Sequence, residues 1–413
     1  MHKCRGCRSV EMTTVFDLGV QPWCNDFLPL DRVGKEEKYP LRLVHCDSCS
    51  LLQLDHTVPK EVMFADHQYL SGMTQTLKDH FFSVAIETLK QLPNVAHDTL
   101  VVDIGGNDGT QLLQYVRAGL SSSQVLNIEP AKRVAAVAEQ AGIETIKEFF
   151  NNDCAQTHFL GRNASIINAS GVFFHLEELH SAIRGIKHML ADDGIFVVQF
   201  MYAGAMVDGN NFDTIYHEHL CYYTLQSLEN LLKPYGLKVF DAHLTDIHSG
   251  SIVAKICHDD SLYEITPRYL KTKANDQKYT LEEFQKFAAF AESKKNVLKE
   301  MLVDLKTFEK AKIYAYGAPA KGNTLLNYFD IDSSLIDKAV EINDMKIGNF
   351  LPQSHIPIER ETQDDLPDYY LLLSHNFADE ILERNRENIE NGLKFIIPFP
   401  EAKIVGKEYF DER

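Results

Sequence analysis

The chain has 413 residues, of which 45% are hydrophobic and 24% are charged, so its composition is that of a soluble globular protein with two or three domains. Its 41 Lys and Arg residues against 59 Asp and Glu residues give a formal charge of −18, which repels nucleic-acid backbones and acidic lipid headgroups. No apolar run approaches the roughly 20 residues that span a bilayer, and no secretory signal is visible. We therefore expect a cytoplasmic protein that binds neither nucleic acid nor membrane, and no feature indicates an obligate protein partner.

The first region contains two cysteine pairs, Cys4-x-x-Cys7 and Cys46-x-x-Cys49. Each pair points two thiolates at one centre, and two pairs supply the four ligands of a tetrahedral zinc ion. A reducing cytosol disfavours disulfides, and four thiolates leave no open position for catalysis, so we predict a structural zinc. The alternative is four reduced structural cysteines without metal. Short strands are expected around the pairs, at Leu41–His45 and Leu51–Leu54.

The middle region alternates apolar runs with helical patterns, which is typical of a doubly wound parallel sheet. Helical periodicity begins at Met73–Leu92. Strands are predicted at Thr99–Ile104, Gln124–Ile128, Gly142–Ile146, Ser165–Asn168 and Ile195–Met201. Helices are predicted at Gln111–Ala118, Lys132–Gln140 and Leu179–Leu190. The runs Leu237–Ala242 and Ser251–Cys257 are joined by a short link, so we expect a hairpin at the sheet edge.

The last region carries a second, smaller α/β pattern after a polar stretch, 258–275, that we interpret as a loop. A charged amphipathic helix is expected over Leu281–Glu309. Strands are predicted at Lys312–Tyr316, Ile336–Ile342, Tyr369–Ser374 and Lys394–Pro398, and helices at Ala320–Phe329 and Ala378–Asn385.

A glycine-rich loop, Asp103-Ile104-Gly105-Gly106-Asn107-Asp108-Gly109, ends the first strand of the middle region and opens a helix. Glycines let the backbone approach a ligand, and the helix N-terminus offers N–H groups. The next strand ends in Glu129-Pro130, where a carboxylate can accept hydrogen bonds from both hydroxyls of a ribose. The loop lacks Gly-x-Gly-x-x-Gly, which disfavours a nicotinamide-dependent oxidoreductase.

Together these features predict a site for S-adenosylmethionine. The alternative is a tight turn with a surface glutamate. The predicted cofactor residues are Asp103, Gly105, Asn107, Gly109, Glu129, Pro130 and, at the end of the fourth strand, Asn168.

A dense cluster of titratable groups, Tyr216-His217-Glu218-His219-Leu220-Cys221-Tyr222-Tyr223, follows the Ile195–Met201 strand. On a strand, His217 and His219 would share one face. Three interpretations remain open: a metal site with His175 as third ligand, a surface loop, or acid–base chemistry on a small substrate, which histidine supports near neutral pH. His175 itself can alternatively be a helix-capping or core residue.

The order of these motifs, ending in Tyr316-Gly-Ala-x-Ala-Lys321-Gly-Asn323, resembles the sugar C-methyltransferases, which methylate nucleotide-linked keto-deoxysugars. The resemblance covers nearly the whole chain. It implies an α/β protein with an N-terminal zinc-binding domain (1–70), a central Rossmann-like class I methyltransferase domain (71–260) and a smaller C-terminal Rossmann-like domain (261–413).

The resemblance also assigns roles to single residues. It implies that His219 is the base, with Tyr216, Glu218 and His175 close to the sugar. Tyr222 is a further candidate for orienting the sugar. The residues implied to hold the sugar nucleotide are Tyr69, Lys321, Asn323, Asn343, Lys346 and Asn376. The sequence departs from the family at His375, where an aromatic residue often precedes the asparagine. A plain strand-to-helix turn is the alternative for the Lys321 segment, which is not a P-loop.

The implied reaction is C-methylation: a base removes the proton next to a ketone, and the enolate attacks the sulfonium methyl. Two alternatives compete with it. One is an O- or N-methyltransferase on another small acceptor, and the other is a zinc-knuckle binding module with a degenerate methyltransferase domain.

Overall fold

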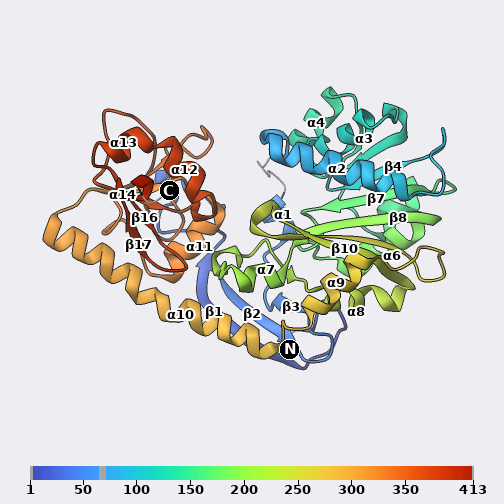
Figure 1. The fold of residues 1–413 in the computed structure, drawn as a ribbon, viewed down its shortest axis with the longest axis horizontal. Helices are drawn as coiled ribbons and strands as arrows, with labels where there is room; N and C mark the ends of the chain where they lie inside the picture. Colours follow the sequence, from blue (N-terminus) through green and yellow to red (C-terminus); the bar gives the residue numbers. More distant parts are fainter. Residues whose placement is uncertain (1–2, 65–70, 412–413) are drawn as a thin grey trace.

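The computed structural model describes residues 3–64 and 71–411, and within these residues the strands form three sheets (Figure 1). The fold is mixed α/β, as predicted. The first sheet is antiparallel, in the order β1-β2-β3-β9. Its strands are β1 (Met12–Pro22), β2 (Lys38–Cys46), β3 (Leu52–Leu54) and β9 (Cys221–Tyr222), and helix α1 (Lys60–Phe64) follows β3. Because β9 comes from the middle of the chain, this sheet already joins distant segments.

The second sheet has seven strands in the order β10-β11-β8-β7-β4-β5-β6. Its first five strands in sequence run parallel, and the hairpin β10–β11 adds the antiparallel edge that the sequence predicted. The strands are β4 (Val101–Ile104), β5 (Val125–Ile128), β6 (Glu144–Ile146), β7 (Ala164–Ser170), β8 (Leu190–Met201), β10 (Leu237–Thr245) and β11 (Ser251–His258). The helices of this part are α2 (Gln75–Gln91), α3 (Thr110–Arg117), α4 (Lys132–Gln140), α5 (Asn152–His158), α6 (Leu179–Met189), α7 (Ala203–Asp208) and α8 (Leu225–Leu232).

The third sheet has six strands in the order β14-β13-β12-β15-β16-β17, parallel except for β17. The strands are β12 (Ile313–Tyr316), β13 (Lys338–Glu341), β14 (Ile358–Arg360), β15 (Tyr369–Leu372), β16 (Lys394–Ile397) and β17 (Lys403–Val405). Its helices are α11 (Ala320–Tyr328), α12 (Ala378–Arg384), α13 (Arg386–Glu390) and α14 (Glu408–Asp411).

Two helices connect the second and third sheets. The stretch that we interpreted as a loop contains helix α9 (Pro267–Asp276), so that interpretation was wrong. The Thr266 hydroxyl accepts a hydrogen bond from the Tyr269 N–H, and Pro267 occupies the first helical turn, where proline is well tolerated. Helix α10 (Leu281–Asp304), ending in a π-helical turn over Leu305–Glu309, runs along the underside of the molecule in Figure 1.

The first sheet is packed between the other two parts of the molecule. One set of its buried side chains, including Phe16 and Leu43, joins the core of α10 and the third sheet. Phe16 meets Phe287 of α10 edge to face, with ring centroids 6.3 Å apart. Cys46 and Leu51 instead belong to the core that lies under the seven-stranded sheet. The first sheet therefore fixes how the two larger sheets face each other.

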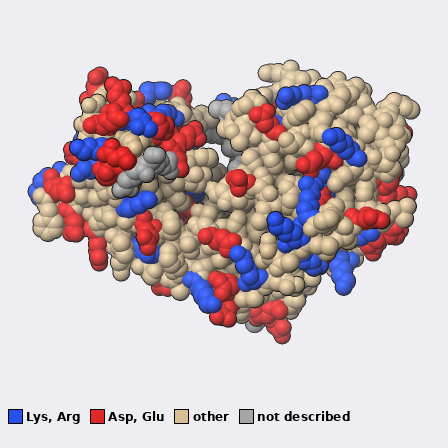
Figure 2. All heavy atoms as spheres, in the orientation of Figure 1, with Lys and Arg blue, Asp and Glu red and all other residues tan. Residues whose placement is uncertain are grey.

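The molecule has two lobes in the view of Figure 1, one around the third sheet and one around the seven-stranded sheet. Figure 2 shows that the surface is hollowed between them and that Asp and Glu crowd the left-hand lobe. Across the described ranges, no helix combines the length and the apolar character needed to cross a membrane.

Candidate functional site

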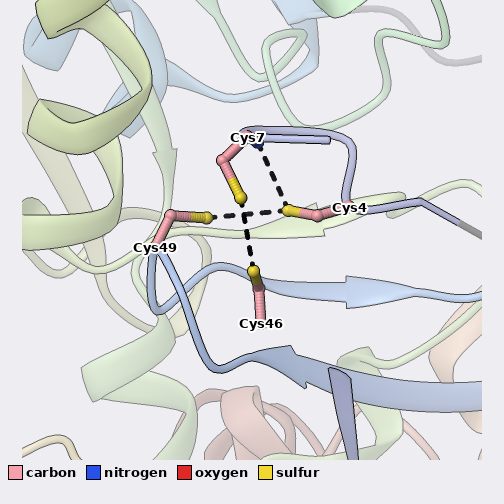
Figure 3. Close-up of side chains that lie close together, drawn as sticks. All are labelled: Cys4, Cys7, Cys46 and Cys49. Atoms are coloured by element: carbon pink, nitrogen blue, oxygen red, sulfur yellow. Dashed lines mark hydrogen bonds between the residues drawn. The ribbon is translucent and has the colours of Figure 1, made fainter. Parts of the chain in front are cut away.

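Four cysteines meet at one end of the first sheet, where Cys46 is the last residue of β2 (Figure 3). The Cys4 and Cys49 Sγ atoms are 3.6 Å apart, those of Cys7 and Cys46 are 3.5 Å apart, and all four lie within 4.8 Å of one another. A tetrahedral zinc ion with Zn–S bonds of about 2.3 Å requires S–S separations of about 3.8 Å. A disulfide requires about 2.05 Å. The four thiols thus form a zinc-binding cluster, as the sequence predicted.

Hydrogen bonds around the cluster favour a thiolate at Cys4. The backbone N–H groups of Gly6 and Cys7 lie 3.3 and 3.4 Å from its sulfur, and Gln53 Nε2 lies 3.1 Å from it. The bond from Cys49 and these further donors lower the pKa of Cys4 to about 4. Because a thiolate is the form that ligates a metal, the surroundings suit zinc.

The glycine-rich loop follows β4 and leads into α3. Gly105 and Gly109 have φ angles of +63° and +77°, and Asn107 also lies in the left-handed region at +55°. A Cβ on Gly105 would lie 2.6 Å from Val172, so the loop accepts no side chain there. The peptide N–H of Asn107 donates to Glu129 Oε2 at 3.2 Å. This hydrogen bond joins the glycine-rich loop to the residue that follows β5, 22 positions further along the chain.

The same loop gathers three carboxylates. Burial, together with repulsion from Glu129 and Asp108, raises the pKa of Asp103 to about 8, and burial also raises the pKa of Glu129. A cationic ligand would relieve this concentration of negative charge. S-adenosylmethionine brings a sulfonium and an ammonium group as well as ribose hydroxyls for Glu129, so the residues present fit it. Pro130, half-buried, continues the same strand end.

Asn168 lies deeper than the loop. It pairs with Asp103 across β4 and β7, and its Oδ1 accepts hydrogen bonds from Gln111 and Tyr115 of α3 at 3.1 and 3.0 Å. Among the described residues, its Nδ2 is buried without a partner. We therefore interpret Asn168 as a support for the loop and α3, and its contact with the cofactor stays a prediction.

The segment from Val172 to His175 links the glycine loop to the histidine cluster. Val172 packs on Gly105, and three residues later the His175 ring lies 5.1 Å from the His219 ring, centroid to centroid. His175 Nδ1 is 2.6 Å from the Glu218 carbonyl oxygen. The two motifs that the sequence singled out, which begin at Asp103 and Tyr216, are thus adjacent across one short loop.

The His219 ring is oriented by neighbouring aromatic rings and by one hydrogen bond to the backbone. Its Nδ1 lies 2.8 Å from the carbonyl oxygen of Thr214, which fixes the proton on Nδ1 and the basic lone pair on Nε2. The ring of Tyr216 lies 3.9 Å away and that of Phe174 4.6 Å away, while Tyr222 is more distant at 6.2 Å. The imidazole is therefore oriented before any ligand arrives.

His217 points away from this group. Residues 216–219 form a turn, closed by the His219 N–H on the Tyr216 carbonyl, so the two histidines do not share a face as they would on a strand. The His217 ring packs against Tyr39 of β2, and burial lowers the pKa of His217 to about 4. Within the described residues, the structure groups His217 and His219 in no three-ligand metal cluster.

Glu218 faces the first sheet. Its Oε1 accepts two hydrogen bonds of 2.6 Å, from Trp23 Nε1 and from Asn25 Nδ2, and only 4% of the residue is exposed. Sequence analysis missed both donors because 195 and 193 residues separate them from Glu218. No local pattern reveals a contact of that range.

The third sheet contributes cationic groups at the carboxyl ends of its strands. Lys321, at the start of α11, donates to Asn376 Oδ1 and lies 3.9 Å from the buried Asp213. His375 also reaches Asp213, with Nε2 2.8 Å from Oδ2. Burial lowers the pKa of Lys321, which Asp213 partly offsets. Asp213 directly precedes Thr214, so this group adjoins the His219 segment.

The other predicted substrate residues make internal contacts. Lys346 donates to the Ala318 carbonyl at 2.8 Å, Asn343 accepts from the Met345 N–H at 3.0 Å, and Asn323 donates to the Cys24 carbonyl at 2.6 Å. Tyr69 lies outside the described residues. Two surface hollows, of about 510 and 130 Å³, lie elsewhere and include none of the predicted site residues.

A seven-stranded sheet in this order, with a glycine loop after β4 and an acid after β5, defines a methyltransferase that uses S-adenosylmethionine. Comparisons with known proteins agree. Family models match a zinc binding domain at residues 4–64, a methyltransferase domain at 79–242 and the C-methyltransferase C-terminal domain at 246–400. The C-methyltransferase NovU of Streptomyces niveus is 31% identical over 416 residues, covering 98% of this chain and 97% of NovU.

The chain belongs to this C-methyltransferase family, and its cofactors are S-adenosylmethionine and zinc. Solved methyltransferases are more distant. Magnesium protoporphyrin IX methyltransferase from Synechocystis PCC 6803, with bound SAH, has 15% identity and a TM-score of 0.33, covering 48% of this chain and 91% of that one. The N-methyltransferase NodS from Bradyrhizobium japonicum has 12% identity and a TM-score of 0.34, covering 45% and 98%.

Proposed function

We propose that the enzyme methylates a carbon next to the ketone of a nucleotide-linked keto-deoxysugar in the cytoplasm, with His219 as the base. The division into residues 1–70, 71–260 and 261–413 is part of this proposal. The observation that supports it is that three groups are connected through adjacent residues. Val172 packs on the glycine loop three residues before His175, whose ring neighbours that of His219. His219 contacts Thr214, which directly follows the Asp213 that Lys321 and His375 approach. Each group matches one chemical part of the reaction.

The acceptor carbon must lose a proton before it can attack a methyl group. With its Nδ1 hydrogen-bonded to Thr214, His219 accepts a proton at Nε2, and a positioned base contributes roughly 10²–10⁴-fold to such a step. The negative charge then develops on the ketone oxygen, where hydrogen-bond donors stabilise it. The Tyr216 hydroxyl is the proposed donor, because its ring lies 3.9 Å from the His219 ring. His175, whose Nδ1 faces the Glu218 carbonyl and whose ring lies 5.1 Å from that of His219, is proposed to orient the sugar by accepting from a hydroxyl at Nε2.

The cofactor supplies an electrophilic methyl group on a sulfonium. Glu129, through its carboxylate, and the backbone N–H groups of residues 105–109 are the proposed contacts to its ribose and methionine parts. Asp103 lies close against the loop, since a Cβ on Gly106 would come within 2.8 Å of its carboxyl group. Lys321 and Lys346 are proposed to meet the diphosphate, since the net charge of −18 would otherwise repel it.

The test uses S-adenosylmethionine carrying a ¹³C methyl group and a panel of nucleotide-linked 4-keto-6-deoxysugars. We expect a product whose labelled methyl carbon couples directly to a sugar ring carbon in NMR. A labelled methyl on oxygen or nitrogen would instead support the alternative O- or N-methyltransferase. No transfer to any keto-sugar, with transfer to an unrelated acceptor, would contradict the proposal.

A further inference from the structure

The turn Trp23-Cys24-Asn25, which directly follows β1, touches both other parts of the molecule. Trp23 and Asn25 donate their side-chain N–H groups to Glu218 Oε1, each at 2.6 Å. Between them, the Cys24 carbonyl accepts from Asn323 Nδ2 of α11, also at 2.6 Å. Three consecutive residues of the zinc-binding region thus contact the histidine cluster and the third sheet.

The two bonds to Glu218 have a specific electrostatic consequence. Burial raises the pKa of Glu218 above its ordinary value, and the bonds from Asn25 and Trp23 offset part of this rise. Both donors are neutral, so they favour the carboxylate without neutralising its charge. Within the described parts of the chain, both bonds end on Oε1, which leaves Oε2 as the oxygen that can meet a ligand.

An interface built only for stability would not need this arrangement. A buried carboxylate is costly, and apolar contacts of the same volume stabilise an interface at least as well. The first sheet already supplies such contacts through Phe16 and Leu43. The buried charge therefore points to a role in the site.

We propose that Trp23 and Asn25 are positioning residues that favour the carboxylate form of Glu218 and fix its Oε1, which leaves Oε2 for the sugar, so that the zinc-binding region completes the active site. This inference rests on the proposed function, because Glu218 has this role only if residues 216–219 surround the substrate. Zinc would then act at a distance: it would hold the end of β2 at Cys46 beside the start of β1, while the turn follows the other end of β1.

Trp23→Phe keeps an aromatic ring and removes the indole N–H, and Asn25→Ala removes the second donor. Losing a hydrogen bond to a charged group should lower kcat by about 10- to 100-fold, while KM for S-adenosylmethionine stays unchanged. The limb of the kcat pH profile that belongs to Glu218 should move to higher pH, because the carboxylate loses a donor. Arg32→Ala, which breaks only an exposed ion pair with Asp26, is the control and should change neither quantity.

A double-mutant cycle separates positioning from folding. In a Glu218→Gln background, Trp23→Phe and Asn25→Ala should each cause less than a twofold further loss. Equal losses in both backgrounds, or a wild-type kcat and pH profile in both single variants, would overturn the inference. Zinc content and circular dichroism verify that each variant is folded. If either Trp23→Phe or Asn25→Ala fails to fold, the remaining variant tests the inference. Full turnover by Glu218→Gln alone would also overturn the inference, whereas failure of the wild type to methylate any keto-deoxysugar would overturn the proposed function.

Discussion

Lys321 is a cationic side chain at the start of α11, and burial lowers its pKa, which the nearby Asp213 carboxylate partly offsets. We predict that KM for the nucleotide sugar rises with pH before the ordinary lysine range near 10.5 is reached, because the ammonium loses its proton there. Lys321→Arg should move that rise to higher pH, since a guanidinium stays charged. Initial rates at varied nucleotide-sugar concentration and fixed cofactor concentration, repeated across the pH range, give this KM.

Lys321→Met should weaken nucleotide-sugar binding at all pH values while binding of S-adenosylhomocysteine stays intact. Lys306→Met is a suitable control, because Lys306 pairs with Asp337 and lies away from Asp213. An unchanged KM in the Lys321 variant would remove this residue from the site.

At the scale of one loop, Gly105 combines a positive φ with the contact to Val172. We predict that Gly105→Val abolishes cofactor binding. A ligand at about 100 times its Kd stabilises the native state by about 2.7 kcal/mol, so S-adenosylhomocysteine should raise the Tm of the wild type and leave that of the variant unchanged. Gly161→Val is the control, because it has a positive φ of +74° but open space around it. A thermal shift in Gly105→Val equal to that of the wild type would contradict the assignment of the loop.

Helix α9 is tied to the sheet edge by the Asp241–Arg268 ion pair. Burial alone would raise the pKa of Asp241, but the hydrogen bonds from Arg268 and Thr266 lower it to about 2. Because this is below the unfolded value of about 3.9, the ionised form stabilises the fold above about pH 4, and this stabilisation is lost as pH falls toward 2. Asp241→Asn should therefore lower Tm at pH 7, and the difference from wild type should shrink on acidification.

The control is Asp365→Asn, whose ion pairs with Lys312 and Lys338 are exposed and contribute little. A difference between Asp241→Asn and wild type that stays constant from pH 7 to pH 3 would contradict the role of the ion pair.

Sequence patterns predicted the elements whose periodicity is unbroken. The alternation of strands and helices predicted the central sheet and its edge hairpin, because β4 and β5 are buried throughout and β7 is buried over four successive residues. Strand β1 escaped prediction, since its pairing with β2 shifts register between Thr14 and Phe16 and again between Asp17 and Val20, which breaks the alternation. Helix α9 escaped because a polar helix resembles a loop in composition.

The candidate site divides in the same way. Residues in short local motifs, such as the cysteine pairs and the glycine loop, could be singled out from their spacing in the sequence. Trp23, Asn25 and His375 were not, because their significance comes from partners in another part of the chain. His217 could not be separated from His219 by residue type, and only the turn at 216–219 distinguishes them.

At the scale of the whole molecule, zinc stabilises the sheet that separates the two lobes. Structural zinc contributes roughly 10–16 kcal/mol in small zinc-binding peptides. We predict one zinc per chain, and that Cys46→Ser loses the metal and exposes residues 4–64 to proteolysis. Cys257→Ser, which alters a buried cysteine outside the cluster, is the control and should retain the metal. Metal-free wild-type protein with full proteolytic resistance would contradict this prediction.

Loss of zinc should affect cofactor binding and methyl transfer differently. Because the glycine loop belongs to the seven-stranded sheet, binding of S-adenosylhomocysteine should persist in Cys46→Ser. Methyl transfer should fall, since β1 and the turn after it would no longer be fixed. Calorimetric titration and turnover measured on the same preparation test both statements.

The central claim is that His219 removes a proton from the carbon that receives the methyl group. Solvent deuterium exchange at that carbon tests it most directly, in D₂O with the nucleotide sugar and with S-adenosylhomocysteine in place of the methyl donor. Wild type and His217→Asn should incorporate deuterium, whereas His219→Asn should do so roughly 10²–10⁴-fold more slowly while still binding cofactor. Exchange at the wild-type rate in His219→Asn, with His217→Asn impaired instead, would contradict the account.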